Sequence, residues 1–152
     1  MGLEEIKNHN TRQYVVFRLA KEEYGVDTRN VTIIERMTTI TRVPKTPPFI
    51  LGVINLRGDI IPVMDLRARF NLPAVEYTDD TRIVIIKVED TSMGMVVDSV
   101  AEVIQLSEDA IENVTNFSND LSMDFILGVG KADDRIITLL NLEKLIRISD
   151  NN

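Results

Sequence analysis

The amino-acid sequence predicts a mostly β fold with a few short helices, in which two small barrels or sheets share a core. Two observations support this prediction. Apolar runs of strand length alternate with polar turns through most of the 152 residues, the pattern typical of β-hairpins. In addition, residues 51–53 match 127–129 and residues 59–66 match 135–142, at a constant offset of 76. The chain therefore contains an internal repeat.

The repeat extends upstream of these segments. Residues 14–19 resemble 82–87, and Gly25 and Val31 correspond to Gly94 and Val100 at an offset of 69. A β-rich unit of about 70 residues is thus used twice, which is too few copies for a solenoid. Chance similarity between hydrophobic strands is the alternative, but order, spacing and glycines all favour a duplication.

The elements of the first unit follow from its local sequence. Its strands are expected at residues 13–20, 23–27 and 31–36, with a turn at 27–30, followed by a hairpin within residues 52–66. The segment before this hairpin is irregular because Pro44, Pro47 and Pro48 supply no donor to a strand ladder. Asp65 is expected to cap a short helix over residues 66–70.

The second unit repeats this order after an acidic link at residues 76–80. Strands are expected at residues 82–88, 93–97 and 101–106, then a helix start at 107–109, a loop or short helices at 113–123, and a hairpin from 125–130 and 135–140. Asn141 is expected to cap a final helix at residues 142–147.

The hairpin at residues 52–66 carries the most distinctive local feature. Its arms are apolar on both faces, so most of their surface should be covered by protein. Its turn contains Arg57 and Gly58, whereas the second unit has Lys-Ala-Asp-Asp at residues 131–134. Scaffold positions should match between the copies and site residues need not. Arg57, at an exposed tip without a base, nucleophile or metal ligand beside it, is therefore a candidate for binding a partner, and Gly58 for turn geometry.

Composition limits the function classes. The chain has no cysteine, which excludes disulfides and thiolate metal sites, and no apolar run long enough to cross a membrane. The N-terminal residues lack a signal core, so we expect a cytoplasmic protein with no membrane insertion. The net charge of −7 argues against nucleic acid as a partner. Residues 35–69 carry six cations and three anions, a net +3 that leaves −10 elsewhere, and such a basic patch can steer an acidic protein partner.

The sequence argues against an enzyme. The single histidine, His9, lies in the N-terminal tail, so the body of the chain lacks the common general base and metal ligand. No Gly-rich phosphate loop is present, and the paired acids occupy expected turns. We therefore expect no catalytic residue, cofactor or metal. An oligonucleotide-binding barrel is a further alternative, but Tyr14, Phe17 and Phe49 lie in apolar strand contexts expected in a core rather than on a stacking surface.

The turn segment at residues 52–58, followed by 61–66, belongs to a set of motifs running from residue 13 to 147. The others are residues 23–27, 41–44 with Pro48, 94–98, 127–130, 134–135 and 140–145. Together these segments closely resemble the CheW family of bacterial chemotaxis coupling proteins. The resemblance implies a single CheW-like domain at 13–147, made of two intertwined SH3-like β-barrel subdomains with repeat units of roughly 13–75 and 81–147. Residues 1–12 and 148–152 are expected to be tails.

The resemblance also implies a function. The protein would be a non-enzymatic adaptor, located at receptor arrays, that couples the cytoplasmic tip of methyl-accepting chemoreceptors to the regulatory domain of the histidine kinase CheA. Carried over by position, the family's receptor-binding groove between the barrels would involve Val31, Ile34, Arg57, Val100 and Val103. The alternatives are a CheW-like module of a larger chemotaxis protein, of the receiver-fused CheV type or a kinase regulatory domain, and, remotely, a small β-barrel enzyme.

One position departs from the family pattern. Many relatives carry a glutamate two residues after the position of Val31, where this chain has Ile33 and where Glu35 follows two residues later. Whether Glu35 replaces that acid is left open by the sequence.

Overall fold

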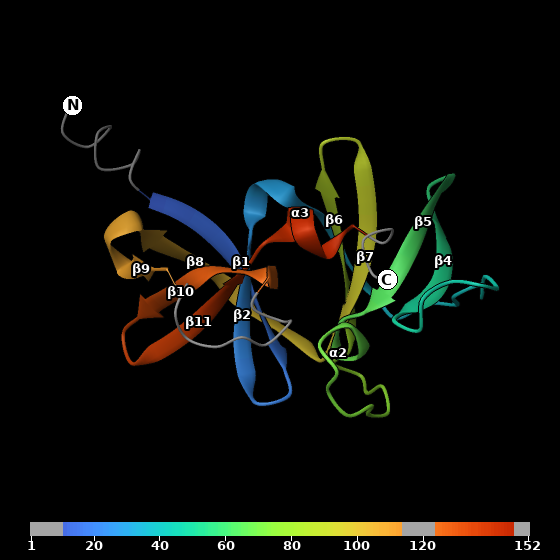
Figure 1. The fold of residues 1–152 in the computed structure, drawn as a ribbon, viewed down its shortest axis with the longest axis horizontal. Helices are drawn as coiled ribbons and strands as arrows, with labels where there is room; N and C mark the ends of the chain where they lie inside the picture. Colours follow the sequence, from blue (N-terminus) through green and yellow to red (C-terminus); the bar gives the residue numbers. More distant parts are fainter. Residues whose placement is uncertain (1–10, 114–123, 148–152) are drawn as a thin grey trace.

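The computed structural model describes residues 11–113 and 124–147, and it contains two β-sheets lying side by side with short helices between them (Figure 1). The mostly β fold is therefore confirmed. The elements of the first half are β1 (Thr11–Leu19), β2 (Glu22–Asp27), η1 (Thr28–Asn30), β3 (Val31–Arg36), β4 (Ile50–Leu56), β5 (Asp59–Asp65) and α2 (Leu66–Arg69). Those of the second are β6 (Arg82–Val88), β7 (Thr91–Val97), β8 (Ser99–Ser107), η2 (Glu108–Ala110), β9 (Ile111–Glu112), β10 (Ile126–Ala132), β11 (Arg135–Leu140) and α3 (Leu142–Leu145).

Both sheets close on themselves in the manner of barrels. The strand order of the larger sheet is β8-β1-β2-β11-β10-β9, and η2 leads directly from the first of these strands to the last. The smaller sheet has the order β3-β6-β7-β5-β4. Its two ends are joined where Thr41, downstream of β3, bridges to Val53 of β4 through two backbone hydrogen bonds of 2.9 and 2.8 Å.

Each barrel combines strands from both repeat units. The β1–β2 hairpin of the first unit pairs with β8 and β11 of the second. The β6–β7 hairpin of the second unit pairs with β3 and β5 of the first. The two units have therefore exchanged their first hairpins. Once the repeat equivalences are applied, the two strand orders are the same except for β9, which has no counterpart strand in the smaller sheet.

The two barrels share one central hydrophobic cluster. It contains Phe17 and Leu19 of β1 together with Met64 of β5 and Met93 and Met95 of β7, all essentially inaccessible to solvent. Burying this apolar surface stabilises both barrels at once. The prediction of a shared core is confirmed, and each barrel adds a smaller cluster of its own.

A stack of rings crosses the same central region. Tyr24 stacks on Phe17 with ring centroids 5.8 Å apart, and Phe70 of the segment after α2 contacts both Tyr24 and Phe125 at the same distance. The guanidinium of Arg69 lies 4.3 Å from the ring centroids of Phe49 and Phe125, which are equivalent positions in the two units. Like Phe17, the rings of Tyr14 and Phe49 are buried, as expected for core residues.

The predicted element boundaries differ in a few places. Strands β3 and β6 coincide with their predictions, whereas β1 begins at Thr11, inside the expected tail, and β9 was not predicted. The predicted helix caps are confirmed: Asp65, Ser107 and Asn141 each accept a backbone N–H bond at the start of a helical turn. Ser107, however, begins only a 3₁₀ turn. The loop expected at 113–123 lies outside the described residues from residue 114 onward, as do residues 1–10 and 148–152.

Candidate partner-binding site

Arg57 and Gly58 form the two-residue turn between β4 and β5. Both have positive φ, 54° and 93° respectively, which are the signs of a type I′ turn. The Gly58 N–H donates to Asn55 Oδ1 at 2.9 Å, which fixes the turn from within. The Arg57 side chain is exposed at the end of this short loop. An arginine in the left-handed region is uncommon, so the turn holds it in a conformation that arginine does not prefer.

The four apolar candidates lie on β3 and β8, which are equivalent end strands of the two sheets. Val31 and Val100 are half-buried and pack against the central cluster. Ile34 and Val103, three residues further along each strand, are 38% and 56% exposed. The two units therefore present matching pairs, each with one residue on the core and one on the surface.

Both strands contain a β-bulge between the two members of their pair. In β3 the pairing with β6 skips Thr32, and in β8 the pairing with β1 skips Ala101, which is the equivalent residue. A bulge re-aims the side chains that follow it. A spacing of three already places two residues of a strand on opposite faces, and the burial of β3 alternates regularly from Val31 to Arg36. The matching bulges are thus a further feature that the two units share.

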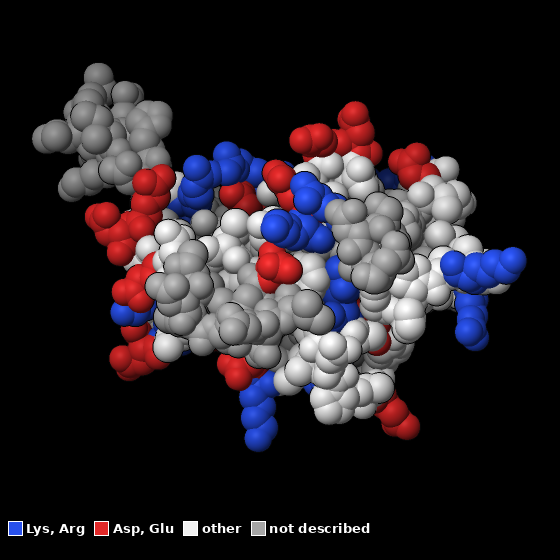
Figure 2. All heavy atoms as spheres, viewed as in Figure 1, with Lys and Arg blue, Asp and Glu red and all other residues white. Residues whose placement is uncertain are grey.

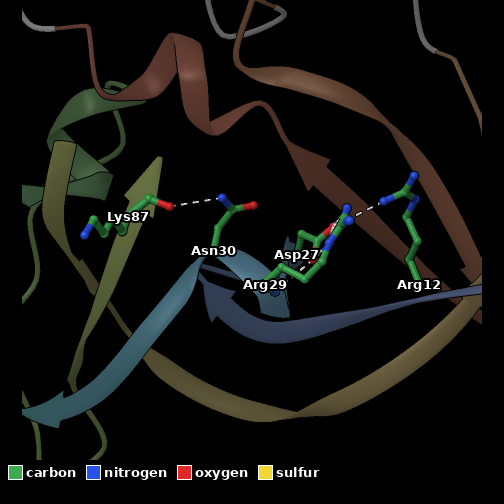
Figure 3. Close-up of polar contacts among 5 residues, drawn as sticks. All are labelled: Arg12, Asp27, Arg29, Asn30 and Lys87. Atoms are coloured by element: carbon green, nitrogen blue, oxygen red, sulfur yellow. Dashed lines mark hydrogen bonds and ion pairs between the residues drawn. The ribbon is translucent and has the colours of Figure 1, made fainter. Parts of the chain in front are cut away.

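The short η1 helix sets the start of β3 (Figure 3). Asp27 caps it by accepting the Arg29 backbone N–H at 2.9 Å. The Arg29 guanidinium donates three further hydrogen bonds to the same carboxylate, two from Nε and one from Nη2. Asn30 Nδ2 donates to the Lys87 carbonyl at 3.0 Å, which ties η1 to the end of β6. Burial alone would raise the pKa of Asp27, but the hydrogen bonds from Arg29 outweigh burial and lower the pKa. This network holds Val31, the next residue, at the edge of the cluster.

Arg57 lies on a different element from the four apolar residues. The β4–β5 hairpin that carries it ends the strand order of the smaller sheet at the side opposite β3. In Figure 1 this hairpin points away from the larger sheet. The internal repeat therefore relates Val31, Ile34, Val100 and Val103 to one another, and Arg57 lies on the β4–β5 turn, a separate element of the smaller barrel.

Two exposed apolar residues at equivalent positions of the two units were not predicted from the sequence. Ile60 of β5 and Ile136 of β11 occupy equivalent positions and are each 64% exposed. Ile60 is therefore an exception to the prediction that most of the surface of the first hairpin is covered by protein. The signal that could have revealed them is the Ile-Ile pair at the same place in both units, because two consecutive strand residues face opposite sides.

Charge is distributed unequally between the ends of the molecule. Figure 2 shows acidic side chains gathered at the left end, over β9 and the β10–β11 turn, and basic side chains projecting at the right end beside β4. Within residues 11–113 and 124–147, no group of three or more His, Asp or Glu residues is arranged to hold a metal ion. None of the helices in the same residues has the length and hydrophobicity needed to cross a membrane. The surface features of this fold are thus apolar patches and charge.

Comparison with known proteins identifies the family. The family model described as the CheW-like domain matches residues 13–150. This chain belongs to the CheW family. The chemotaxis protein CheW of Bacillus subtilis is 38% identical over 135 residues, covering 87% of this chain and 85% of that protein. The CheW of Klebsiella aerogenes is 35% identical over 135 residues, covering 89% of this chain and 81% of that protein.

A solved structure of the CheW family has the same fold. The crystal structure of the scaffolding protein TtCheW from Thermoanaerobacter tengcongensis is 39% identical in sequence and matches with a TM-score of 0.83. The match covers 90% of this chain and 93% of that one. The chain thus shares the family and the fold of a protein that is described as a scaffolding protein.

Proposed function

We propose that this CheW-family protein is a non-enzymatic, cytoplasmic adaptor that couples the cytoplasmic tip of chemoreceptors to the regulatory domain of the histidine kinase CheA. The observation that carries the proposal is the presence of two separate, repeat-equivalent pairs of exposed apolar side chains. Ile34 and Val103 form one pair on β3 and β8, and Ile60 and Ile136 form the other on β5 and β11. An adaptor needs two surfaces that can be occupied together, and exposed apolar residues mark such surfaces.

The receptor-facing surface is assigned to the β3 and β8 pair. Ile34 and Val103 are exposed, whereas Val31 and Val100 of the same strands pack against the central cluster. The exposed pair suits the apolar stripe of an amphipathic receptor helix. Arg57 then supplies a charge-assisted contact at the margin. Glu35, half-buried on β3, is the acid nearest in sequence to the position where many relatives carry glutamate and this chain has Ile33.

The kinase-facing surface is assigned to the two hairpins. Ile60 and Ile136 lie on the outer faces of β5 and β11, at matching places on the two barrels. The kinase regulatory domain resembles this fold, so one of its barrels can pair with one of these hairpin faces. Apolar anchors of this size are the residues from which interface energy mainly comes.

An NMR titration with two matched variants tests the assignment. Labelled full-length protein is titrated separately with a receptor-tip helical hairpin and with the kinase regulatory domain. We expect Val103→Glu to weaken receptor binding alone and Ile136→Glu to weaken kinase binding alone, because both side chains are exposed and their loss leaves the core intact. Equal effects of either variant on both partners, or no shifts with either partner at high micromolar concentration, would remove the two-surface assignment.

Arg57 provides an independent test of the same function. Arg57→Ala should leave the fold intact, because the side chain lies in an exposed turn, and weaken partner binding by about 1–3 kcal/mol. The circular dichroism spectrum checks the fold and calorimetry checks binding. An unfolded variant, or one with unchanged affinity for both partners, contradicts the role of Arg57.

A further inference from the structure

A cavity of about 180 Å³ lies beside α2, at the end of the five-stranded barrel. Its lining comes from the end of β5 and the start of α2, from the end of β7, from Thr81 before β6, and from the link that joins the two repeat units. In Figure 1 this link is the loop below α2. The lining residues are Asp65, Arg67, Val75, Glu76, Tyr77, Thr78, Thr81, Val96 and Asp98. None of them belongs to the surfaces assigned above.

The floor of the cavity is fixed by one ion pair. Arg67 donates from Nε and Nη2 to the two carboxylate oxygens of Asp98, at 2.9 and 2.7 Å, and from Nη1 to the Pro73 carbonyl at 2.8 Å. Asp98 also accepts the Ala20 backbone N–H from the β1–β2 turn at 2.8 Å. The Arg67 side chain is only 13% exposed. These bonds join the link, the end of β7 and the other barrel, so the cavity does not depend on a ligand for its shape.

The link itself is held in place over the cavity. The Thr78 N–H donates to the buried Thr81 Oγ1 at 2.8 Å, and the Asp80 N–H donates to Thr78 Oγ1 at 3.1 Å. Between these anchors and Pro73, the link leaves Val75 49% and Tyr77 48% exposed. Two large apolar side chains therefore stand in water at the rim of a preformed cavity.

The cavity combines an apolar wall with a net negative charge. Val75, Tyr77 and the buried Val96 supply the wall. The lining has three carboxylates, Asp65, Glu76 and Asp98, against the single cation Arg67. Arg67 pairs with Asp98, and its charge also interacts with Asp65, whose Oδ1 accepts the Arg67 backbone N–H at 3.0 Å. Glu76 belongs to none of the ion pairs formed among the described residues. Burial raises the pKa of Tyr77, and the Asp65 carboxylate raises it further. The phenol of Tyr77 thus lies near enough to Asp65 for an electrostatic interaction between them.

We propose that this cavity binds the side chain of a basic residue, arginine or lysine, presented by a partner polypeptide. The alkyl stem packs against Val75, Val96 and the ring of Tyr77, and the cation meets Asp65 and Glu76. The ring of Tyr77 can also contact the cation through its face. An anion would face a lining with a net negative charge, and a wholly apolar group would desolvate its carboxylates without compensation. The chemistry of the lining therefore selects a cation with an apolar stem.

NMR titrations of the full chain with N-acetyl-arginine amide, and with N-acetyl-leucine amide as the neutral control, test the proposal. We expect saturable shifts at Val75, Tyr77 and Val96 with a dissociation constant on the order of 1 mM, as a ligand of this size allows. The leucine probe should not produce them. No saturation, or equal shifts with both probes, would overturn the proposal.

Two variants and one further probe sharpen the test. Glu76→Gln should weaken binding of the arginine probe by roughly two- to fivefold, the effect of losing one partly exposed charge pair. The double variant that carries both Glu76→Gln and Asp65→Asn should weaken binding further. Asparagine at position 65 keeps the side-chain oxygen that caps α2, so the fold is retained. Glu89→Gln, at an exposed acid on the β6–β7 turn, is the matched control and should change nothing. Equal binding by Glu76→Gln would contradict the proposal, and spermidine binding more tightly than the arginine probe would overturn the assignment to a polypeptide side chain.

Discussion

The hairpins β4–β5 and β10–β11 share one frame and end in different turns. Each has a bulge near its start, at Ile50 to Gly52 in the first and Ile126 to Gly128 in the second. At the base of the two hairpins, the carbonyls of Phe49 and Phe125 accept equivalent backbone bonds of 2.7 Å. Even the first turn residue has the same positive φ in both, 54° at Arg57 and 56° at Asp133. The backbone frame was therefore retained in both copies.

The charged residues of the two hairpins differ in whether they form ion pairs. Arg135 of the second hairpin forms ion pairs with Glu23 and Glu102, and Lys131 forms one with Glu112. Among the described residues, no ion pair holds Arg57 of the first hairpin. Aspartate tolerates the left-handed region of Asp133 better than arginine does. The charged side chains of the second hairpin thus form ion pairs within the larger barrel. The first hairpin instead exposes an arginine whose positive φ is unfavourable for that residue type.

The largest effect should come from the bulge glycines. A Cβ at Gly52 would lie 2.1 Å from the Thr41 carbonyl oxygen, and its φ is +151°, whereas a Cβ at Gly128 would lie 2.6 Å from the Glu112 carbonyl oxygen without a positive φ. Gly52→Ala should therefore lower the free energy of unfolding by about 3 kcal/mol or more, and Gly128→Ala by less. Urea denaturation of both variants measures this, and a larger loss at Gly128 would contradict the comparison.

A smaller effect is expected at the second turn residue. Gly58 has a φ of 93°, and nothing lies within 4 Å of a Cβ built there, so Gly58→Val carries a conformational cost without a clash. We expect a loss of about 1–2 kcal/mol in the free energy of unfolding. Asp134→Val, the equivalent change in a turn position without positive φ, should cost little. Thermal unfolding of the two variants distinguishes them, and equal losses would show that the turns do not differ as described.

The ion pairs of the second hairpin predict a pH-dependent difference. The hydrogen bonds from Arg135 lower the pKa of Glu23, so this pair stabilises the fold above the ordinary glutamate pKa of about 4.3, and the stabilisation is lost as pH falls through the lowered value. Arg135→Gln should cost about 1 kcal/mol at pH 7, since solvent screens this partly exposed pair, and less at pH 3. Urea unfolding at both pH values checks this, and a pH-independent loss would exclude the charge as its cause.

The smallest effect on stability, opposite in sign, is expected at Arg57. Asn-Gly is the preferred pair for a type I′ turn, so Arg57→Asn should raise the free energy of unfolding by about 0.5–1 kcal/mol, because asparagine adopts positive φ more readily. Partner binding should fall by about tenfold, the usual loss for an important interface arginine. Denaturation and calorimetry on the same sample test both changes. A variant that loses stability would refute the conformational argument.

Local sequence was sufficient to locate most strands. It was not sufficient to predict which strands pair with one another. The apolar runs at β3 and β6 located those strands to the residue, because each is bounded by polar residues or turns. The exchange of the β1–β2 and β6–β7 hairpins was not predictable, since a repeat shows which strands are equivalent and not which ones pair. The two-residue β9 is too short to have a pattern of its own.

The candidate site was also predictable only in part. The turn at Arg57 and Gly58 was identified because the two copies differ there, and the structure adds the positive φ values that the sequence does not show. The exposure of Ile60 was missed because its strand is apolar on both faces, so alternation gave no indication of which face lies outward. The cavity beside α2 depends on contacts between the link and two distant strands, which no local pattern contains.

The exchanged hairpins have a consequence for the history and dissection of this fold. A chain consisting of one repeat unit could complete neither barrel, because each barrel needs a hairpin from one unit and the remaining strands, three in the smaller barrel and four in the larger, from the other. Two such chains could complete both by swapping hairpins, which is the arrangement of a domain-swapped homodimer. The present protein has the strand pairing that joining the two chains of such a dimer would give. Its two barrels therefore cannot be separated by truncation, and a partner bound to one of them contacts strands that also belong to the unit completing the other.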